Sequence, residues 1–523
     1  MTTTCTEAAD EPMLEAATLP VRDLADLAVR EGRRPRPVYG AHKWFARRLG
    51  SAFRALLIAS TLPENGDFWG AFEKGVDLGG TTVLDPFVGG GTSVIEAQRL
   101  GASVLGTDVD PVAVAITSFQ SRLHDLPSLD ATLAGLSASI GQTMRPFYER
   151  EDGTTGLHHF WVQRVDCGHC GRAYDAHPHH VLAAEVDSKT CYAVCRCCGE
   201  IGQIRASWSS FMCRACRKRT NTRKGNVDHG EATCPHCRRT ERLIDVGART
   251  GTPPRFRLFA IETIPHGSGG RPVPMRDRKI VRVSAGDLAR YDEASRALVA
   301  LLEDGGPGMP PRRIPQERSD DRLIRYGYRR YADLFCDRQK LHLLLLSRAI
   351  MTLPPGNERD AMGIAFSDHL KANCMLASYA IGYRRLSPLF AFRAFRHVPR
   401  PVELNPWVQG TGRGSFPNAV RQVARAAAWA KHPSEYRLTG GFTTPRTESK
   451  GGADIRLASA ASLTHVLDAS IDLVLTDPPY FDNIAYSEGS CRVPGWWLAR
   501  HATRPATRTS SRALPRRRAL CTN

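Results

Sequence analysis

Asp477, Pro478, Pro479 and Tyr480 follow an apolar segment at 471–475 and combine hydrogen-bond acceptors with an aromatic ring. The two prolines stiffen the turn and remove two backbone N–H donors. The Asp477 carboxylate and the Pro478 carbonyl remain as acceptors, and Tyr480 adds a flat surface beside them. Two acceptors and a stacking ring suit the exocyclic amine of a base flipped out of a nucleic-acid helix. The alternative is an ordinary surface turn, because Asp-Pro is a common turn pair.

A second candidate site lies in residues 82–92, Thr-Val-Leu-Asp-Pro-Phe-Val-Gly-Gly-Gly-Thr, which indicate a strand entering a glycine-rich turn. A helix over 93–100, a strand over 102–106 and then Asp108 follow. Glycines let the backbone approach a ligand closely, and an acid after the second strand can bind ribose hydroxyls. The loop is neither a phosphate-binding P-loop nor the Gly-x-Gly-x-x-Gly of a dinucleotide site. A plain strand–turn–helix unit without a ligand is the alternative.

Eight of the 15 cysteines form four Cys-x2-Cys pairs: Cys167/Cys170, Cys195/Cys198, Cys213/Cys216 and Cys234/Cys237. The first two pairs are 24 residues apart and the last two 17, which agrees with four-cysteine zinc sites. We therefore expect tandem zinc ribbons within 160–245, each built from consecutive pairs. A disulfide framework is the alternative, but the polar N-terminal residues show no secretory signal.

The composition favours a polyanionic partner. The 523 residues are 42% hydrophobic, as in a chain of several globular domains, and contain no apolar run long enough for a membrane span. The formal charge is +18, of which residues 489–523 contribute +8 because they contain eight arginines and no acid. Basic clusters at 214–219 and 238–239 suit contacts with phosphates. An ordinary solvated surface is the alternative for these clusters.

Apolar periodicity outlines the elements that must position these groups. It predicts short strands at 455–457 and 471–475, an entry turn followed by an amphipathic helix within 36–60, and helices over 126–144, 284–302, 332–353, 366–381 and 418–431. The two candidate sites, separated by residues 121–450, should rejoin in one parallel sheet with a ligand at the carboxyl ends of its strands. The expected organisation is a helical region at 1–80, half of an α/β domain at 81–120, zinc ribbons at 160–245, a helical insertion at 284–450, the second half at 451–488 and a basic tail at 489–523.

These motifs resemble those of the zinc-ribbon-containing adenine-specific DNA methylases, whose N-terminal region is of the DUF1156 type. The similarity extends over most of residues 30–488 and is carried by the cysteine pairs and the segments 42–48, 85–92, 333–339, 403–406 and 476–488. It implies a Rossmann-like methyltransferase sheet with a large zinc-ribbon and helical insertion, the helices serving target recognition. It also implies a cytoplasmic enzyme that methylates adenine N6 of double-stranded DNA from S-adenosylmethionine, with defence-system partner proteins acting against phage.

The resemblance assigns a role to each candidate residue. The cofactor loop would contain Asp85, Phe87, Gly89 and Gly91, and Asp108 would bind the ribose hydroxyls. Asp477 and Pro478, stiffened by Pro479, would accept hydrogen bonds from the adenine amine, and Tyr480 would stack on the flipped base. Catalysis would then come from positioning, without a covalent nucleophile.

The similarity ends after residue 488. The arginine-rich composition of 489–523 cannot complete a hydrophobic core. We therefore expect an incomplete sheet and impaired activity. Three alternatives stay open: methylation of cytosine N4, an RNA substrate, and a catalytically dead methylase fold that only binds nucleic acid.

Overall fold

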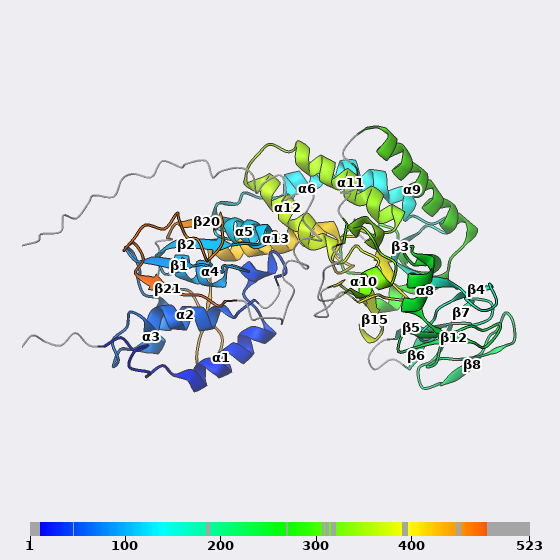
Figure 1. Ribbon diagram of the computed structural model, residues 1–523, viewed down its shortest axis with the longest axis horizontal. Helices are drawn as coiled ribbons and strands as arrows, with labels where there is room; N and C mark the ends of the chain where they lie inside the picture. Colours follow the sequence, from blue (N-terminus) through cyan, green and yellow to red (C-terminus); the bar gives the residue numbers. More distant parts are fainter. Residues whose placement is uncertain are drawn as a thin grey trace, which may run out of the picture.

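The computed structural model of the chain describes residues 11–44, 47–184, 189–267, 270–305, 308, 313–314, 321–389, 396–445 and 451–478. Pro479, Tyr480 and the basic tail at 489–523 lie outside these ranges. Figure 1 shows an elongated molecule, with a parallel sheet at one end, the cysteine-rich region at the other and helices between them. The prediction of an α/β protein with a parallel sheet is confirmed.

The parallel sheet has four strands in the described residues, in the spatial order β20-β2-β1-β21. β1 (Thr82–Asp85) and β2 (Ser103–Asp108) come from the first half of the domain. β20 (Ala453–Leu457) and β21 (Leu473–Val474) come from the second half. All three pairings are parallel. The two halves therefore rejoin across residues 121–450 as the sequence predicts.

Helices pack against this sheet, and the hydrophobic core lies between them and the strands. α4 (Thr92–Arg99) connects β1 to β2 and is buried along most of its length because α2 (Gly50–Ala59) packs against it. α5 (Pro111–Gln120) follows β2 and contacts β20. Its start combines two helix-start signals, a proline at the first turn and an N-cap at which Asp110 Oδ1 accepts a hydrogen bond from Val112 N over 2.9 Å. α1 (Val21–Arg33) and α3 (Phe68–Lys74) pack on the outer side of α2.

The helix expected after an entry turn within 36–60 begins later than the sequence pattern predicts. A 3-10 turn occupies Pro37–Gly40, and the α-helix begins only at Gly50. The intervening segment contains Trp44, Arg47 and Arg48, which follow a helical spacing in the sequence but lie against the glycine-rich loop. Tertiary contacts with that loop therefore override the local helical pattern.

A second sheet is antiparallel and lies on the far side of the helices (Figure 1). Its path is β14-β13-β3-β17, with β4 also paired to β3. The strands are β3 (Thr154–Asp166), β4 (Ala173–Asp175), β13 (Arg255–Pro265), β14 (Lys279–Arg282) and β17 (Val402–Leu404). The long β3 and β13 pair along most of their lengths, so the residues between them project from one end of the sheet.

Five helical segments connect the two sheets. They are a composite helix of α6 (Asp130–Leu136), a π turn (Ser137–Gly141) and α7 (Gln142–Met144), then α9 (Ala285–Glu303), α11 (Asp337–Thr352), α12 (Asn357–Leu370) and α13 (Phe416–Lys431). The chain also forms a short helix α10 (Arg322–Arg325) and a hairpin of β18 (Glu435–Tyr436) with β19 (Phe442–Thr443), whose Glu435 forms ion pairs with Arg54 of α2 and Arg99 of α4. The structure confirms that helices lie at the positions predicted over 126–144, 284–302, 332–353 and 418–431.

The helix predicted over 366–381 has the wrong boundaries. α12 ends at Leu370, and β15 (Ser378–Ala380) pairs with β16 (Arg385–Ser387). All ten residues from 361 to 370 are buried. A helix buried on every side has no polar face, so its hydrophobic periodicity does not reveal where it begins or ends.

Short antiparallel strands make up the cysteine-rich region. β5 (Val181–Ala184), β6 (Thr190–Val194) and β7 (Ile201–Arg205) form one sheet, and β8 (Ser210–Met212) and β9 (Arg219–Asn221) form a hairpin. β10 (Val227–Asp228), β11 (Glu231–Thr233) and β12 (Thr240–Arg242) form a third unit, which α8 (Leu243–Thr250) follows. Across the described ranges, no helix is both long and apolar enough to span a bilayer.

Candidate functional site

The carboxyl ends of β1 and β21 bring Asp85 beside the Asp-Pro-Pro segment. Thr476 Oγ1 donates a hydrogen bond of 2.7 Å to Asp85 Oδ1. The same oxygen accepts a bond of 2.9 Å from Phe87 N, and Ser93 Oγ donates to the other oxygen. Burial raises the pKa of Asp85, although these hydrogen bonds oppose the rise. Asp85 therefore organises the glycine-rich loop and fixes the residue immediately before Asp477.

Asp108 ends β2 and holds the two turns that flank it. Its Oδ2 accepts a hydrogen bond of 2.9 Å from Gly89 N, and its Oδ1 accepts one of 2.9 Å from Asp110 N. The side chain is partly exposed, and burial raises its pKa. Each carboxylate oxygen can accept more than one hydrogen bond. Asp108 thus keeps acceptor capacity at the position expected for a ribose ligand.

The glycine-rich loop is covered by the segment that precedes α2. A Cβ atom on Gly90 would lie 2.9 Å from Trp44 Cδ1 and 3.0 Å from Arg47 Cζ. Arg47 Nη1 also donates a hydrogen bond of 2.6 Å to Gly90 O. Gly91 has a φ of 78°, and its Cβ would lie 2.9 Å from Thr117 Oγ1. Close packing and a left-handed turn therefore account for these two glycines without any ligand.

Arg48 forms a two-pronged ion pair with Asp477. The distances are 2.6 Å from Nε to Oδ2 and 3.2 Å from Nη2 to Oδ1. Both side chains are about one-third exposed, at 38% for Arg48 and 32% for Asp477. Thr92 Oγ1 donates a hydrogen bond of 3.2 Å to the Arg48 carbonyl at the start of α4. The ion pair thus connects the 42–48 segment, the glycine-rich loop and the Asp-Pro-Pro segment.

The structure places the described site residues at one edge of the parallel sheet: Asp85, Phe87, Gly89, Gly91, Asp108, Asp477 and Pro478. Pro479 and Tyr480 lie outside the described residues. Two contacts at this edge were not predicted from the sequence: Arg48 with Asp477, and Thr476 with Asp85. Their signal was present, because Arg48 belongs to the 42–48 segment and Thr476 directly precedes Asp477.

The eight paired cysteines form two groups that could each hold a metal ion. One contains Cys167, Cys170, Cys234 and Cys237, and the other Cys195, Cys198, Cys213 and Cys216. The sulfur atoms of each group all lie within 4.8 Å of one another. Convergence into two groups of four is confirmed, but the expectation of tandem sites built from consecutive pairs is wrong. The first pair meets the fourth and the second meets the third, so one site is nested inside the other.

The sulfur distances fit tetrahedral zinc. Four contacts are 3.6 Å for Cys167–Cys237, 3.8 Å for Cys170–Cys234, 3.6 Å for Cys195–Cys216 and 3.6 Å for Cys198–Cys213. Zinc bound to four thiolates at about 2.3 Å requires sulfurs about 3.8 Å apart. Backbone N–H groups lower the pKa of Cys167 to about 7, which favours the thiolate that binds metals.

All four Cys-x2-Cys turns have the same backbone geometry. In each, the residue after the second cysteine donates its N–H to the carbonyl of the first cysteine at 2.9–3.0 Å and has a positive φ. That residue is Gly171 or Gly199 in two turns, where the conformation carries no penalty. In the other two it is Arg217 (φ 56°) or Arg238 (φ 65°), so a strained conformation places a basic side chain at the tip of the turn.

Two other segments of the resemblance, 333–339 and 403–406, meet in the core. The Glu403 carboxylate accepts hydrogen bonds from Arg338 at 2.7 and 2.9 Å, from Tyr148 at 3.0 Å and from Trp161 at 3.1 Å. The carboxylate and the guanidinium are almost fully buried, at 0% and 1% exposure. This cluster joins α11 to β3 and β17, and its role is structural.

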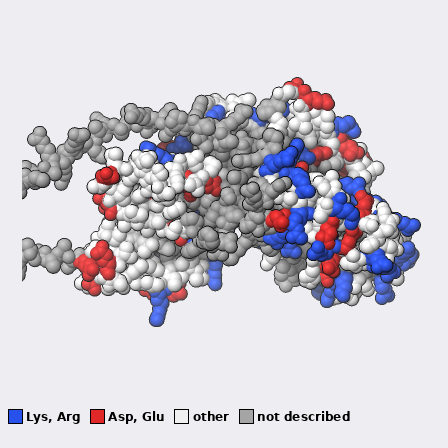
Figure 2. All heavy atoms as spheres, viewed as in Figure 1, with Lys and Arg blue, Asp and Glu red and all other residues white. Residues whose placement is uncertain are grey.

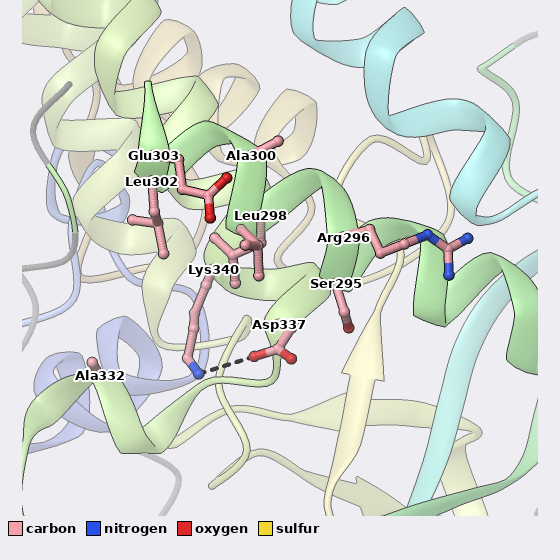
Figure 3. A pocket seen from close by; sticks show the side chains of 10 residues that line it. Ser295, Arg296, Leu298, Ala300, Leu302, Glu303, Ala332, Asp337 and Lys340 are labelled. Carbon is pink, nitrogen blue, oxygen red and sulfur yellow. Dashed lines mark hydrogen bonds and ion pairs between the residues drawn. The ribbon is translucent and has the colours of Figure 1, made fainter. Parts of the chain in front are cut away.

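A groove of about 620 Å³ lies elsewhere, between α9 and α11 (Figure 3). Aliphatic side chains of α9, including Leu298 and Leu302, line much of it, and the Asp337–Lys340 ion pair closes one side. None of its lining residues belongs to the site at the parallel sheet.

Comparisons with protein-family models, with curated proteins and with solved structures found no match to this chain.

Proposed function

We propose that the protein transfers a methyl group from S-adenosylmethionine to the N6 amine of adenine in DNA. One observation carries the proposal: the strand order of the parallel sheet reverses beside β1. β1, β2 and β20 succeed one another in one direction, whereas β21 lies on the other side of β1. Ligands of open parallel sheets bind outside the carboxyl ends of the strands at such a reversal. Asp85 and Thr476 meet at this point, with Asp477 next in the chain.

The adjacent strand β2 ends in groups that suit this cofactor. The partly exposed Asp108 carboxylate would bind the ribose hydroxyls, and the backbone around Gly89 would line the remainder. When bound, S-adenosylmethionine supplies an electrophilic methyl group on a positively charged sulfur. Asp85 contributes indirectly, because its carboxylate holds Phe87 and Ser93 of the loop in place.

Asp477 would orient the target base. Its carboxylate and the carbonyl of the exposed residue Pro478 would accept hydrogen bonds from the two N–H groups of the adenine amine. The amine nitrogen would then point its lone pair at the methyl group, and catalysis would follow from orientation alone. Arg48 supports this role by holding the carboxylate in one rotamer, while the one-third exposure of the pair leaves access for a base.

Mass spectrometry of nucleosides tests the proposal directly. DNA is incubated with the full chain and isotopically labelled cofactor, then digested. Labelled N6-methyladenine that disappears with Asp477→Ala supports the proposal. Label in N4-methylcytosine would instead show that the target base is cytosine. An RNA substrate run in parallel separates the two nucleic acids. Asp108→Ala should weaken cofactor binding in calorimetry and leave DNA binding unchanged.

A second candidate function is nucleic-acid binding without turnover. In the described residues β21 is an edge strand of only two residues, and the Val474 side chain is 57% exposed. An exposed edge with an uncovered apolar side chain is expected when a sheet lacks further strands. DNA binding without transfer of label to any base would establish this function in place of the first.

A further inference from the structure

The inner metal site carries a strongly basic surface that the proposed chemistry does not use. Residues 195–224, called the inner lobe here, contain eight Lys and Arg residues and one acid. The basic residues are Arg196, Arg205, Arg214, Arg217, Lys218, Arg219, Arg223 and Lys224, and all eight side chains are exposed. Four thiolates with one zinc ion add a charge of −2, so the formal charge of +7 becomes about +5 in the loaded lobe.

These cations are not neutralised within the described part of the chain, where no ion pair includes any of the eight. The single acid of the inner lobe, Glu200, lies 4.0 Å from Arg282 outside the lobe. Figure 2 shows Lys and Arg side chains gathered over the cysteine-rich end of the molecule, whereas the parallel-sheet end shows few. The inner lobe thus presents a concentrated positive field to solvent.

An exposed tryptophan lies among these charges. Trp208 is 47% exposed, and the Arg205 guanidinium carbon lies 5.8 Å from its ring centroid. The backbone at this residue is anchored, because Thr222 Oγ1 donates a hydrogen bond of 2.9 Å to the Trp208 carbonyl. Thr222 directly precedes Arg223 and Lys224. A solvent-exposed aromatic ring between cations can pack against the sugars of a duplex while the cations contact its phosphates.

The metal site stiffens this surface. Arg217 occupies a left-handed position (φ 56°) where the equivalent turns at Cys170 and Cys198 use glycine. Lys218 accepts a backbone hydrogen bond of 3.0 Å from Cys213 N, and Arg219 begins β9. Three consecutive cationic side chains are thereby attached to a cross-linked turn, and less conformational entropy is lost when they bind.

We propose that the inner lobe is a DNA-docking surface that contacts the phosphate backbone of the duplex without regard to sequence. The inference rests on the proposed function for its choice of DNA. Binding through phosphates does not require transfer, so Asp477→Ala should bind DNA as the wild type does. A failure of methylation and a failure of docking are therefore distinguishable.

The test measures anisotropy of a labelled DNA duplex with the full zinc-loaded chain, without cofactor, between about 50 and 200 mM salt. The variant K218Q/R219Q/R223Q removes three charges and spares the turn residue Arg217. A matched control, R22Q/R33Q/R296Q, removes three exposed charges from α1 and α9. Zinc content by elemental analysis shows that each variant keeps its metal sites.

Each lost phosphate contact should reduce the slope of log K against log salt by about 0.9. We expect the triple variant to lose about 2 to 3 units of slope and at least about tenfold in affinity at the lower salt concentrations. The control should match the wild type. Trp208→Ala should weaken binding with little change of slope. A triple variant with the control's slope overturns the proposal. Wild-type protein that binds only anionic vesicles or only RNA, and not the DNA duplex, overturns it as well.

Discussion

Removing two cysteine pairs at a time distinguishes nested metal sites from tandem ones. The first variant replaces Cys195, Cys198, Cys213 and Cys216 by serine. In the nested arrangement it destroys only the inner site. The second variant replaces Cys167, Cys170, Cys195 and Cys198, which takes two ligands from each site. Both variants lose four cysteines, so each serves as the control for the other.

The sulfur geometry sets the expected magnitude. Contacts of 3.6–3.8 Å within each group match the edge of a zinc–thiolate tetrahedron. Structural zinc in such sites contributes about 10–16 kcal/mol of binding free energy. A site with two of its four thiolates should therefore lose its ion to a competing chelator. The outer site of the first variant keeps all four ligands and should retain its ion.

The assay is zinc content per chain after dialysis against a chelator. We expect two ions for the wild type, one for the first variant and close to none for the second. The opposite result, with no zinc in the first variant and one ion in the second, would show that consecutive pairs share a metal. Circular dichroism of the first variant should show that the two large sheets persist.

Three further outcomes follow from the geometry. Arg48→Ala should slow methyl transfer at least about tenfold, with Arg48→Lys intermediate and cofactor binding unchanged, because the two-pronged contact with Arg48 helps to orient the Asp477 carboxylate; equal rates would remove Arg48 from the mechanism. Glu403→Ala should lower the free energy of unfolding in urea by about 3–5 kcal/mol, since it leaves the Arg338 charge buried and unpaired; a loss below about 1 kcal/mol would contradict this. Burial lowers the pKa of His42 to about 4, whereas the unfolded chain titrates near 6.5. The unfolded chain therefore binds more protons at this position between these values, and the contribution of His42 to stability should be complete above about pH 6.5 and fall by up to about 3 kcal/mol as the pH drops to about 4. His42→Gln should make the dependence of stability on pH less steep, and an unchanged slope would exclude a contribution from His42.

Local sequence signals identified the two key strands. The apolar run before Asp85 forms β1, which ends at Asp85, whereas the run predicted over 471–475 forms only the two-residue β21, which ends at Val474. An apolar strand followed by a Pro-containing turn is a local pattern, so it can be recognised without knowing the partners of the strand. The start of the helix predicted over 284–302 was equally readable, because Ser284 is a favoured N-cap residue, and it forms a capping box with Asp287 in the structure.

Contacts between distant segments were not readable in the same way. Trp44 and Arg47 follow a helical spacing, yet they lie in an irregular segment because the glycine-rich loop takes up their contacts. The Arg48–Asp477 ion pair joins residues 429 positions apart. Nothing in either segment specifies the other, because a charged side chain accepts any complementary partner that the fold brings within reach.

By itself the sequence determined which residues are candidates for the chemistry: the acids after the strands, the glycine-rich turn and eight cysteines in four pairs. The tertiary structure decided how they combine. It set the reversal of strand order that places Thr476 against Asp85, and it matched the first cysteine pair with the fourth. The physical reason is that each Cys-x2-Cys turn is a local unit with the same geometry, and each pair supplies half of a tetrahedron. Only the strands between the pairs decide which two halves meet.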